Sequence, residues 1–142
     1  VLFRSDVPVK KAAEVSPEDM QKYTLVLWGD AVSNPLMAKV LKADGAGKLP
    51  LSWSKDKLAV GSHSVSASTH VPVMIYPNPL APKSCIILNS GLTFREAHDR
   101  TNSLQNPKLP DWAILDITQA PDAESAGKVV AADFFDAHWQ VK

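Results

Sequence analysis

Two stretches of the chain place polar side chains directly after an apolar run and before a predicted helix. Ligands of open α/β sheets bind beyond the carboxyl ends of the strands, and helix N-termini attract anions. The pattern therefore predicts a ligand-binding site, in which carboxylate and amide groups bond polar groups of the ligand and an arginine holds an anion. The candidate residues are Asp30, Ser33 and Asn34 in the first stretch, and Asn89, Ser90, Thr93 and Arg95 in the second.

A local structural role competes with ligand binding in both stretches. Ser33 or Asn34 can cap the following helix, and Asp30 can stabilise the turn before it. In the second stretch, Thr93 can be the N-cap and Arg95 can form a structural ion pair. This local role is the favoured interpretation. Neither stretch contains the GxGxxG pattern or a P-loop lysine, so the sequence predicts no cofactor.

His70 is a further candidate for ligand binding, because it stands in a polar loop just before a strong predicted strand. A hydrogen-bonded histidine that fixes this loop is the favoured alternative. The four histidines, His63, His70, His98 and His138, form no HxxxH-type pair, and Cys85 is the single cysteine. A metal site would need ligands from distant segments, so the sequence predicts no metal and no internal disulfide.

Three other features have residue types that occur in catalysis. The segment 61–65 (Gly-Ser-His-Ser-Val) resembles the GxSxG nucleophile motif, but valine stands in place of the second glycine, so we expect a serine-rich surface loop. Cys85 begins an apolar run and is expected to be buried. Asp116 and Asp133 lie in or after predicted strands, where they either face a cleft or satisfy a loop. We assign no catalytic residue.

The elements that position these residues begin with an alternation of helix and strand. Ser16, Pro17 and Asp19 have the pattern of a helix N-terminus with a capping box, and this helix is expected to run to about Tyr23. An unbroken apolar run over 24–28 predicts a strand buried on both faces. A second helix is expected to begin after Asn34 and to end at the glycines at 45 and 47.

The remainder of the chain predicts mainly strands. A hairpin is expected from 51–53 and 58–61, and further strands over 6–10, 71–76, 85–88, 112–117 and 127–135, with a helix beginning at Thr93. Pro72 places the strand 71–76 near a sheet edge or marks its first paired position. Together these elements predict one α/β domain over 1–142: a three-layer, Rossmann-like or flavodoxin-like mixed sheet with added β-hairpins. Residues 1–5 are expected to lie outside it.

Composition limits the partners of this domain. The 142 residues hold 15 basic and 15 acidic side chains, which argues against a general nucleic-acid binder. No apolar run approaches the roughly 20 residues needed to span a membrane. The 11 prolines are scattered singly, as expected for stiff turns in a compact fold. The chain starts without methionine or a signal-peptide pattern, and we interpret it as a piece of a longer protein.

Five long strings also carry a family resemblance: residues 25–30 with Ser33 and Asn34, then 69–80, 88–96, 107–113 and 127–136. They resemble the C-terminal region of large bacterial prolyl-oligopeptidase-like (S9-type) serine peptidases or esterases. The resemblance implies an accessory α/β module that follows the catalytic α/β-hydrolase domain of the same chain, with its first strand and helix upstream. It also implies an extracytoplasmic location, either periplasmic or secreted.

No residue of this chain matches the hydrolase motif or triad of that family, so the resemblance transfers no catalytic residue. The resulting hypothesis is a non-catalytic module that docks on the catalytic domain or binds a substrate or partner. The alternative is a small flavodoxin-like domain or enzyme that binds a ligand or nucleotide at the two strand-to-helix loops. A third possibility is a structural scaffold, in which the loop residues serve only their own caps and ion pairs.

Overall fold

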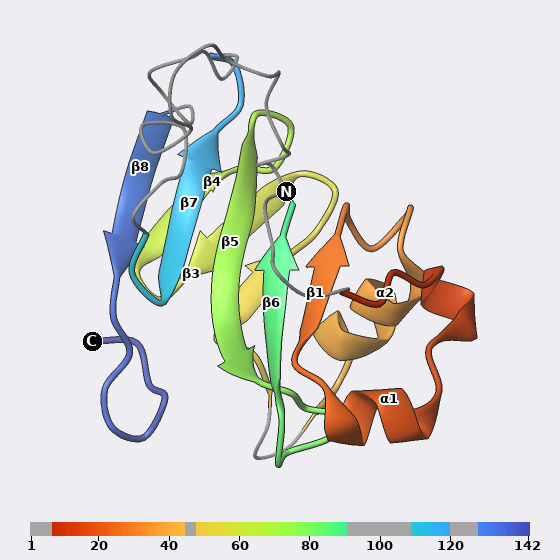
Figure 1. Cartoon of the computed structure of the whole chain (residues 1–142). Coiled ribbons are helices and arrows are strands. Elements are labelled where there is room, and N and C mark those ends of the chain that lie inside the picture. The colour runs from red at the N-terminus through yellow and green to blue at the C-terminus, as the bar shows by residue number, and fades with distance from the viewer. Residues whose placement is uncertain (1–6, 45–47, 91–108, 120–127) are drawn as a thin grey trace, which may run out of the picture.

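The computed structural model describes residues 7–44, 48–90, 109–119 and 128–142, and within them the chain forms two β-sheets and short helices (Figure 1). The helical elements are the 3-10 helix η1 (Ala12–Glu14) and the α-helices α1 (Pro17–Lys22) and α2 (Pro35–Leu41). The strands are β1 (Leu25–Trp28), β2 (Leu51–Trp53), β3 (Lys57–Val60), β4 (His63–Ser66), β5 (His70–Pro77), β6 (Cys85–Asn89), β7 (Trp112–Asp116) and β8 (Lys128–Asp133).

The larger sheet has five strands in the order β1-β6-β5-β7-β8. β1 runs parallel to β6, whereas the pairs β6–β5, β5–β7 and β7–β8 are antiparallel. The second sheet is the antiparallel meander β2-β3-β4. Figure 1 shows α2 and the small sheet on one side of the large sheet. Because β1 and β6 are parallel, their carboxyl ends lie side by side at one end of the large sheet.

The main core fills the space between the large sheet and the elements on that side. Met37 and Val40 of α2 and Leu58 of β3 pack with Ile86 and Leu88 of β6, and all five are at most 1% exposed. Helix α2 therefore contributes an apolar face with three- and four-residue spacing, as its sequence predicted. A helix this short has little intrinsic stability, so its packing on the sheet supplies most of the stability that it has in the folded chain.

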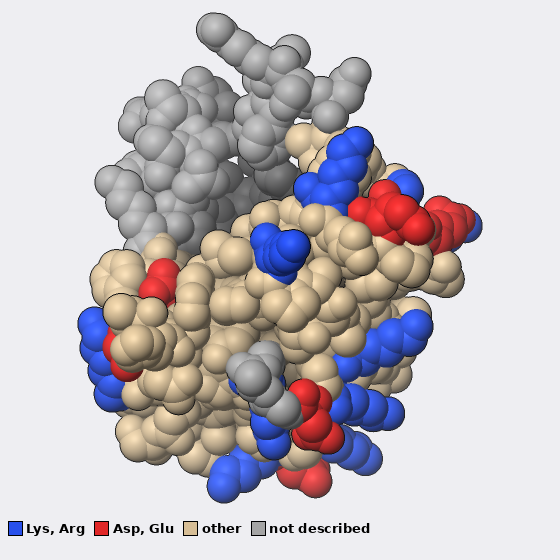
Figure 2. Space-filling model, turned by 90° about the horizontal axis from the view of Figure 1, so that it is seen from below, with Lys and Arg blue, Asp and Glu red and all other residues tan. Residues whose placement is uncertain are grey.

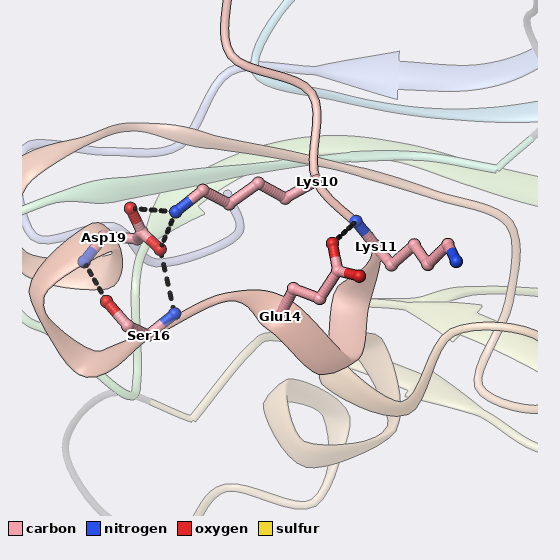
Figure 3. Close-up of polar contacts among 5 residues, drawn as sticks. All are labelled: Lys10, Lys11, Glu14, Ser16 and Asp19. Carbon is pink, nitrogen blue, oxygen red and sulfur yellow. Dashed lines mark hydrogen bonds and ion pairs between the residues drawn. The ribbon is translucent and has the colours of Figure 1, made fainter.

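Helix α1 begins with the capping box that the sequence predicted. The Asp19 N–H donates to Ser16 Oγ at 3.1 Å, and the Ser16 N–H donates to Asp19 Oδ2 at 2.9 Å (Figure 3). Lys10 Nζ also pairs with Asp19, at 2.7 Å from Oδ2. One carboxylate therefore caps the helix and ties the preceding segment to it. Both interactions favour the charged carboxylate, and Lys10 contributes most to holding the pKa of Asp19 below its ordinary value.

Pro72 lies inside β5, which is the central strand of the large sheet and not an edge strand. The Ile75 N–H donates to Asp111 O on the β7 side. The backbone nitrogens of successive strand residues point to opposite neighbouring strands. Pro72 is three positions from Ile75, so its nitrogen faces the β6 side. The ladder between β5 and β6 stops at the pair Val73–Asn89, one residue short of Pro72. The missing N–H of Pro72 therefore removes no ladder bond, so the position is a local edge within a central strand.

The predicted α/β, three-layer, Rossmann-like or flavodoxin-like fold is wrong. Of the described residues, 38% are in strands and 15% in helices, and the α-helices number two. A Rossmann-like sheet needs successive parallel strands joined by crossover helices, whereas here one pair of strands is parallel and hairpin-type pairing dominates. The apolar runs over β1 and β6 indicated strands correctly, but such runs do not specify the direction of the neighbouring strand.

Two local predictions are also wrong. Residues 7–10 form no strand, although they alternate apolar and polar side chains. Residues 63–65 of the segment 61–65, which was expected to be a serine-rich surface loop, belong to β4 and pair with β3, where Leu58 lies opposite Val65. Serine is a weak strand former, so the pairing of β4 depends on its neighbour rather than on its own composition. In addition, the second helix ends at Leu41 with Lys42 as its C-cap, and not at the glycines at 45 and 47. The expected helix from Thr93 lies outside the described residues.

Candidate functional site

The structure brings the described candidate residues to one end of the large sheet. Trp28, the last residue of β1, pairs with Asn89, the last residue of β6, in a parallel register. The loop that carries Asp30 therefore leaves the sheet beside Ser90. Across β6, Asn89 pairs with Val73, so His70 at the start of β5 extends beyond the same end. We call this region the upper end of the sheet (Figure 1). The other two candidates, Thr93 and Arg95, lie outside the described residues.

The loop after β1 is a closed turn built around Asp30. The carboxylate Oδ1 accepts hydrogen bonds from the Ser33 N–H at 2.8 Å, the Ser33 hydroxyl at 2.8 Å and the Val32 N–H at 3.0 Å. The Ser33 N–H is the largest influence that lowers the pKa of Asp30. This oxygen already has three donors, so its lone pairs serve the turn rather than a ligand.

Gly29 allows this turn to form. Its φ is +89°, a value that favours glycine, and an added Cβ would lie 2.6 Å from Ser33 Oγ. The Ser33 hydroxyl in turn accepts the Asp30 N–H at 3.1 Å. Thus the single glycine of the loop serves a backbone conformation and a close side-chain approach. It does not belong to a phosphate-binding glycine pattern.

Asn34 is the N-cap of α2. Its Oδ1 accepts the N–H groups of Leu36 at 3.0 Å and Met37 at 3.1 Å, while its Nδ2 donates to Trp28 O at 3.0 Å. One amide side chain therefore satisfies two free donors of the helix and ties the helix start to the end of β1. In the first stretch the contacts show the local role: Asp30 stabilises the turn and Asn34 caps the helix.

The second stretch contributes a buried hydroxyl at the same end. Ser90 follows the last residue of β6, and its Oγ is buried without a hydrogen-bond partner. A buried hydroxyl that makes no hydrogen bond carries a free-energy cost of about 1–3 kcal/mol. Ser90 is therefore the described candidate whose polar group is not used by the local structure, which the sequence alone could not distinguish from Asp30 or Asn34.

His70 is held by its own loop. Its Nδ1 lies 3.0 Å from Ser66 O and 2.9 Å from Thr69 Oγ1. Because a carbonyl can only accept, Nδ1 carries the proton and donates to Ser66 O. This geometry matches the favoured alternative of a histidine that fixes the loop between β4 and β5. The ring nitrogen Nε2 is then the acceptor left for other contacts.

An acid and a lysine join His70 at the upper end of the sheet. Asp116 pairs with His70 across β5–β7, and Lys128 pairs with Asp116 across β7–β8. The hydroxyl and N–H of Thr118 donate to Asp116 Oδ1 at 2.7 and 2.9 Å. These bonds, and more weakly the charges of His70 and Lys128, lower the pKa of Asp116. Thr118 and Lys128 were absent from the candidates, because only the strand register places them beside His70.

The remaining sequence features carry no assembled chemistry. In the part of the chain that the structure describes, no three His, Cys, Asp or Glu side chains gather as metal ligands. Cys85 is partly buried at the start of β6. Asp133 accepts the Phe134 N–H at 2.7 Å, so it serves the end of β8. None of the helices described is long and apolar enough to cross a membrane.

The comparisons with known proteins found no matching family model, no matching curated protein and no matching solved structure.

Proposed function

We propose that this chain is an accessory module of a larger serine hydrolase and packs against the catalytic domain of that protein. The family is indicated by the sequence strings described above. The structural support is the composition of the face of the large sheet that points away from α2 and the small sheet. Its described strand positions carry no charged residue: Val26, Trp28, Val71, Val73, Ile75, Pro77, Cys85, Ile87, Asn89, Ala113, Leu115, Val129 and Ala132.

This uncharged face retains large apolar side chains in contact with water. Val26 is 46% exposed and Trp28 is 42% exposed at one margin of the sheet, and Val129 is 43% exposed at the other. An antiparallel sheet with one solvated face normally alternates apolar and polar side chains, so an uncharged face on the side away from the main core is typical of a sheet that is covered on both faces. At the centre of this face Val71, Ala113 and Leu115 are at most 8% exposed, so the exposed apolar side chains lie at its two margins. Exposed apolar surface of this kind marks interaction sites. This face is the observation that carries the proposal.

The test is a comparison of the parent hydrolase with and without this region. Deletion should lower the thermal stability of the catalytic domain or its rate on a peptide or ester substrate, because an apolar contact is lost. A double substitution, V26S/V129S, should reproduce part of the loss, whereas K128Q, which changes a nearby exposed charge, should not. Equal stability and activity of the full and shortened proteins would contradict the docking role.

A second candidate is a small-ligand site at the upper end of the sheet, and the partnerless Ser90 hydroxyl is the observation that favours it. Calorimetric titration with AMP, FMN and inorganic phosphate provides the test. Binding that S90A abolishes and that S68A leaves intact would support this candidate. If S90A instead leaves the chain equally or more stable and none of the three probes binds, the hydroxyl is a structural feature only.

A further inference from the structure

Five exposed lysines lie on the side of the molecule opposite the apolar sheet face. We call them the lysine face; they are Lys39, Lys42, Lys48, Lys55 and Lys57. Lys39 and Lys42 belong to α2 and its C-terminus, and Lys57 begins β3. Helix α2 packs against β2, the strand that leads into the turn carrying Lys55. Seen from below, lysine side chains gather along the lower right of the molecule (Figure 2).

The charges of the lysine face are not balanced locally. The acidic residues within 39–57 are Asp44 and Asp56, against five lysines. Among the described residues the ion pair found is Lys10–Asp19, and no lysine of this face takes part in one. The N-terminal lysines differ, since Lys10 is paired and acids surround α1. Lysines left without partners on one surface produce a positive potential that attracts acidic surfaces.

Local structure explains only part of this accumulation. Lys39 and Lys42 lie in the last turn and at the C-cap of α2, where positive charge favours the helix dipole. Lys48, Lys55 and Lys57 lie outside any helix, so the dipole gives no reason for them.

We propose that the lysine face is a docking surface for an acidic protein partner. It lies across the core from the apolar sheet face, so the partner is a second protein and not the domain that packs on the sheet. A protein is favoured over a nucleic acid because Asp44 and Asp56 interrupt the lysines and because the whole chain has no net charge. The lysine face is thus a second interaction surface, and binding of an acidic protein to it does not depend on the proposed accessory role.

The experiment measures binding of a fluorescein-labelled acidic peptide of alternating Glu and Gly by fluorescence anisotropy. Wild-type chain is compared with K39Q/K42Q/K48Q and with the control K83Q/K128Q/K142Q, which removes the same charge from exposed sites elsewhere. At low ionic strength, substitution in the lysine face should weaken binding about tenfold, and the control by less than about twofold. Raising the salt concentration should remove the difference, since exposed charges are then screened.

Three results would overturn the proposal. Equal weakening by the two triple variants would mean that total charge, not this face, attracts the peptide. Absence of peptide binding by the wild type would mean that the face is only solvated. Tighter binding to a labelled DNA duplex than to the peptide would assign the face to a nucleic acid. Far-ultraviolet circular dichroism of each variant verifies that the substitutions at these exposed sites leave the fold intact.

Discussion

At the scale of single residues, the loop after β1 shows how a sequence pattern typical of a binding loop can serve the fold itself. Asp30, Ser33 and Asn34 direct their polar atoms to backbone groups within six residues. The residue types that recognise ligands are also those that cap helices and close turns, because both tasks need short side chains with oxygen acceptors. Only the contacts separate the two roles.

Removal of the Asn34 cap should destabilise the chain measurably. N34A removes the acceptor for two N–H groups of α2 and the donor to Trp28 O, so we expect a loss of about 1 kcal/mol in the free energy of unfolding. N34D keeps the acceptor and loses only the donor, so it should fall between N34A and wild type. Urea denaturation followed by circular dichroism measures all three. Equal stability of N34A and wild type would show that the cap contributes nothing.

Substitution of Gly29 should also be costly. G29A places a Cβ 2.6 Å from Ser33 Oγ and forces a non-glycine residue into the left-handed region, so a loss of about 1–3 kcal/mol is expected. S33A relieves the contact but not the backbone strain. The double variant G29A/S33A should therefore be destabilised by less than the sum of the two single variants. Strict additivity in the denaturation measurements would argue against the contact.

The carboxylates of the described turns should make stability depend on pH in the acid range. Backbone and hydroxyl donors lower the folded-state pKa of Asp30 and Asp116 below the ordinary value of 3.8. A depressed pKa stabilises the fold above the unfolded-state pKa, and this stabilisation is lost as pH falls through the folded-state pKa. D30N keeps an acceptor but cannot titrate. Unfolding midpoints measured from pH 6 to pH 2 should therefore decline less steeply for D30N, and a parallel decline would refute the assignment.

At the scale of secondary-structure elements, local signals predicted helix starts well and strand partners poorly. The capping box of α1 and the cap and apolar spacing of α2 depend on residues three or four apart, so the sequence contains them fully. The central position of β5 depends on residues far along the chain, because β5 pairs with β7. This difference explains why the starts of both α-helices were predicted, whereas the central position of β5 was not. Strand β4 pairs with its near neighbour β3 across a short turn, and it was missed because serine and histidine are not among the residues enriched in strands.

The capping box gives a test at the scale of one element. S16A removes the acceptor of the Asp19 N–H and should cost about 1 kcal/mol of unfolding free energy. K10Q removes only an exposed ion pair and should have a smaller effect that vanishes at high salt. Thermal denaturation at low and high salt distinguishes the two. A salt-sensitive S16A effect with a salt-insensitive K10Q effect would invert this interpretation.

At the scale of the whole molecule, the C-terminal residues tie the two sheets together. The ring of Tyr76 on β5 meets those of Phe135 and Trp139 edge to face, with centroids 5.3 and 5.8 Å away, and its hydroxyl donates to Trp139 O at 3.2 Å. Gly61, in the β3–β4 turn, has no side chain, and an added Cβ would lie 2.7 Å from Val141. These contacts join residues 59 or more positions apart, so no local pattern signals them.

Truncation of one aromatic ring tests this closure. F135A removes a side chain that is 6% exposed and should cost about 3–5 kcal/mol, because the cavity forms inside the aromatic cluster. F134A changes the neighbouring residue, which is 57% exposed, and should change stability by less than about 0.5 kcal/mol. Urea unfolding midpoints give both values. Similar losses from the two variants would show that the cluster does not stabilise the fold.

Patterns among near neighbours in the sequence were enough to predict the caps of α1 and α2, the apolar strands β1, β5, β6 and β7, and the hairpin of β2 and β3. Strand direction, the two-sheet architecture and the gathering of Asp30, Ser90 and His70 at one end of the large sheet became evident only from the folded chain. The physical reason is that capping and turn closure are settled within a few residues. Sheet order and the proximity of loops arise from contacts between distant segments, which compete for burial only when the whole chain has folded.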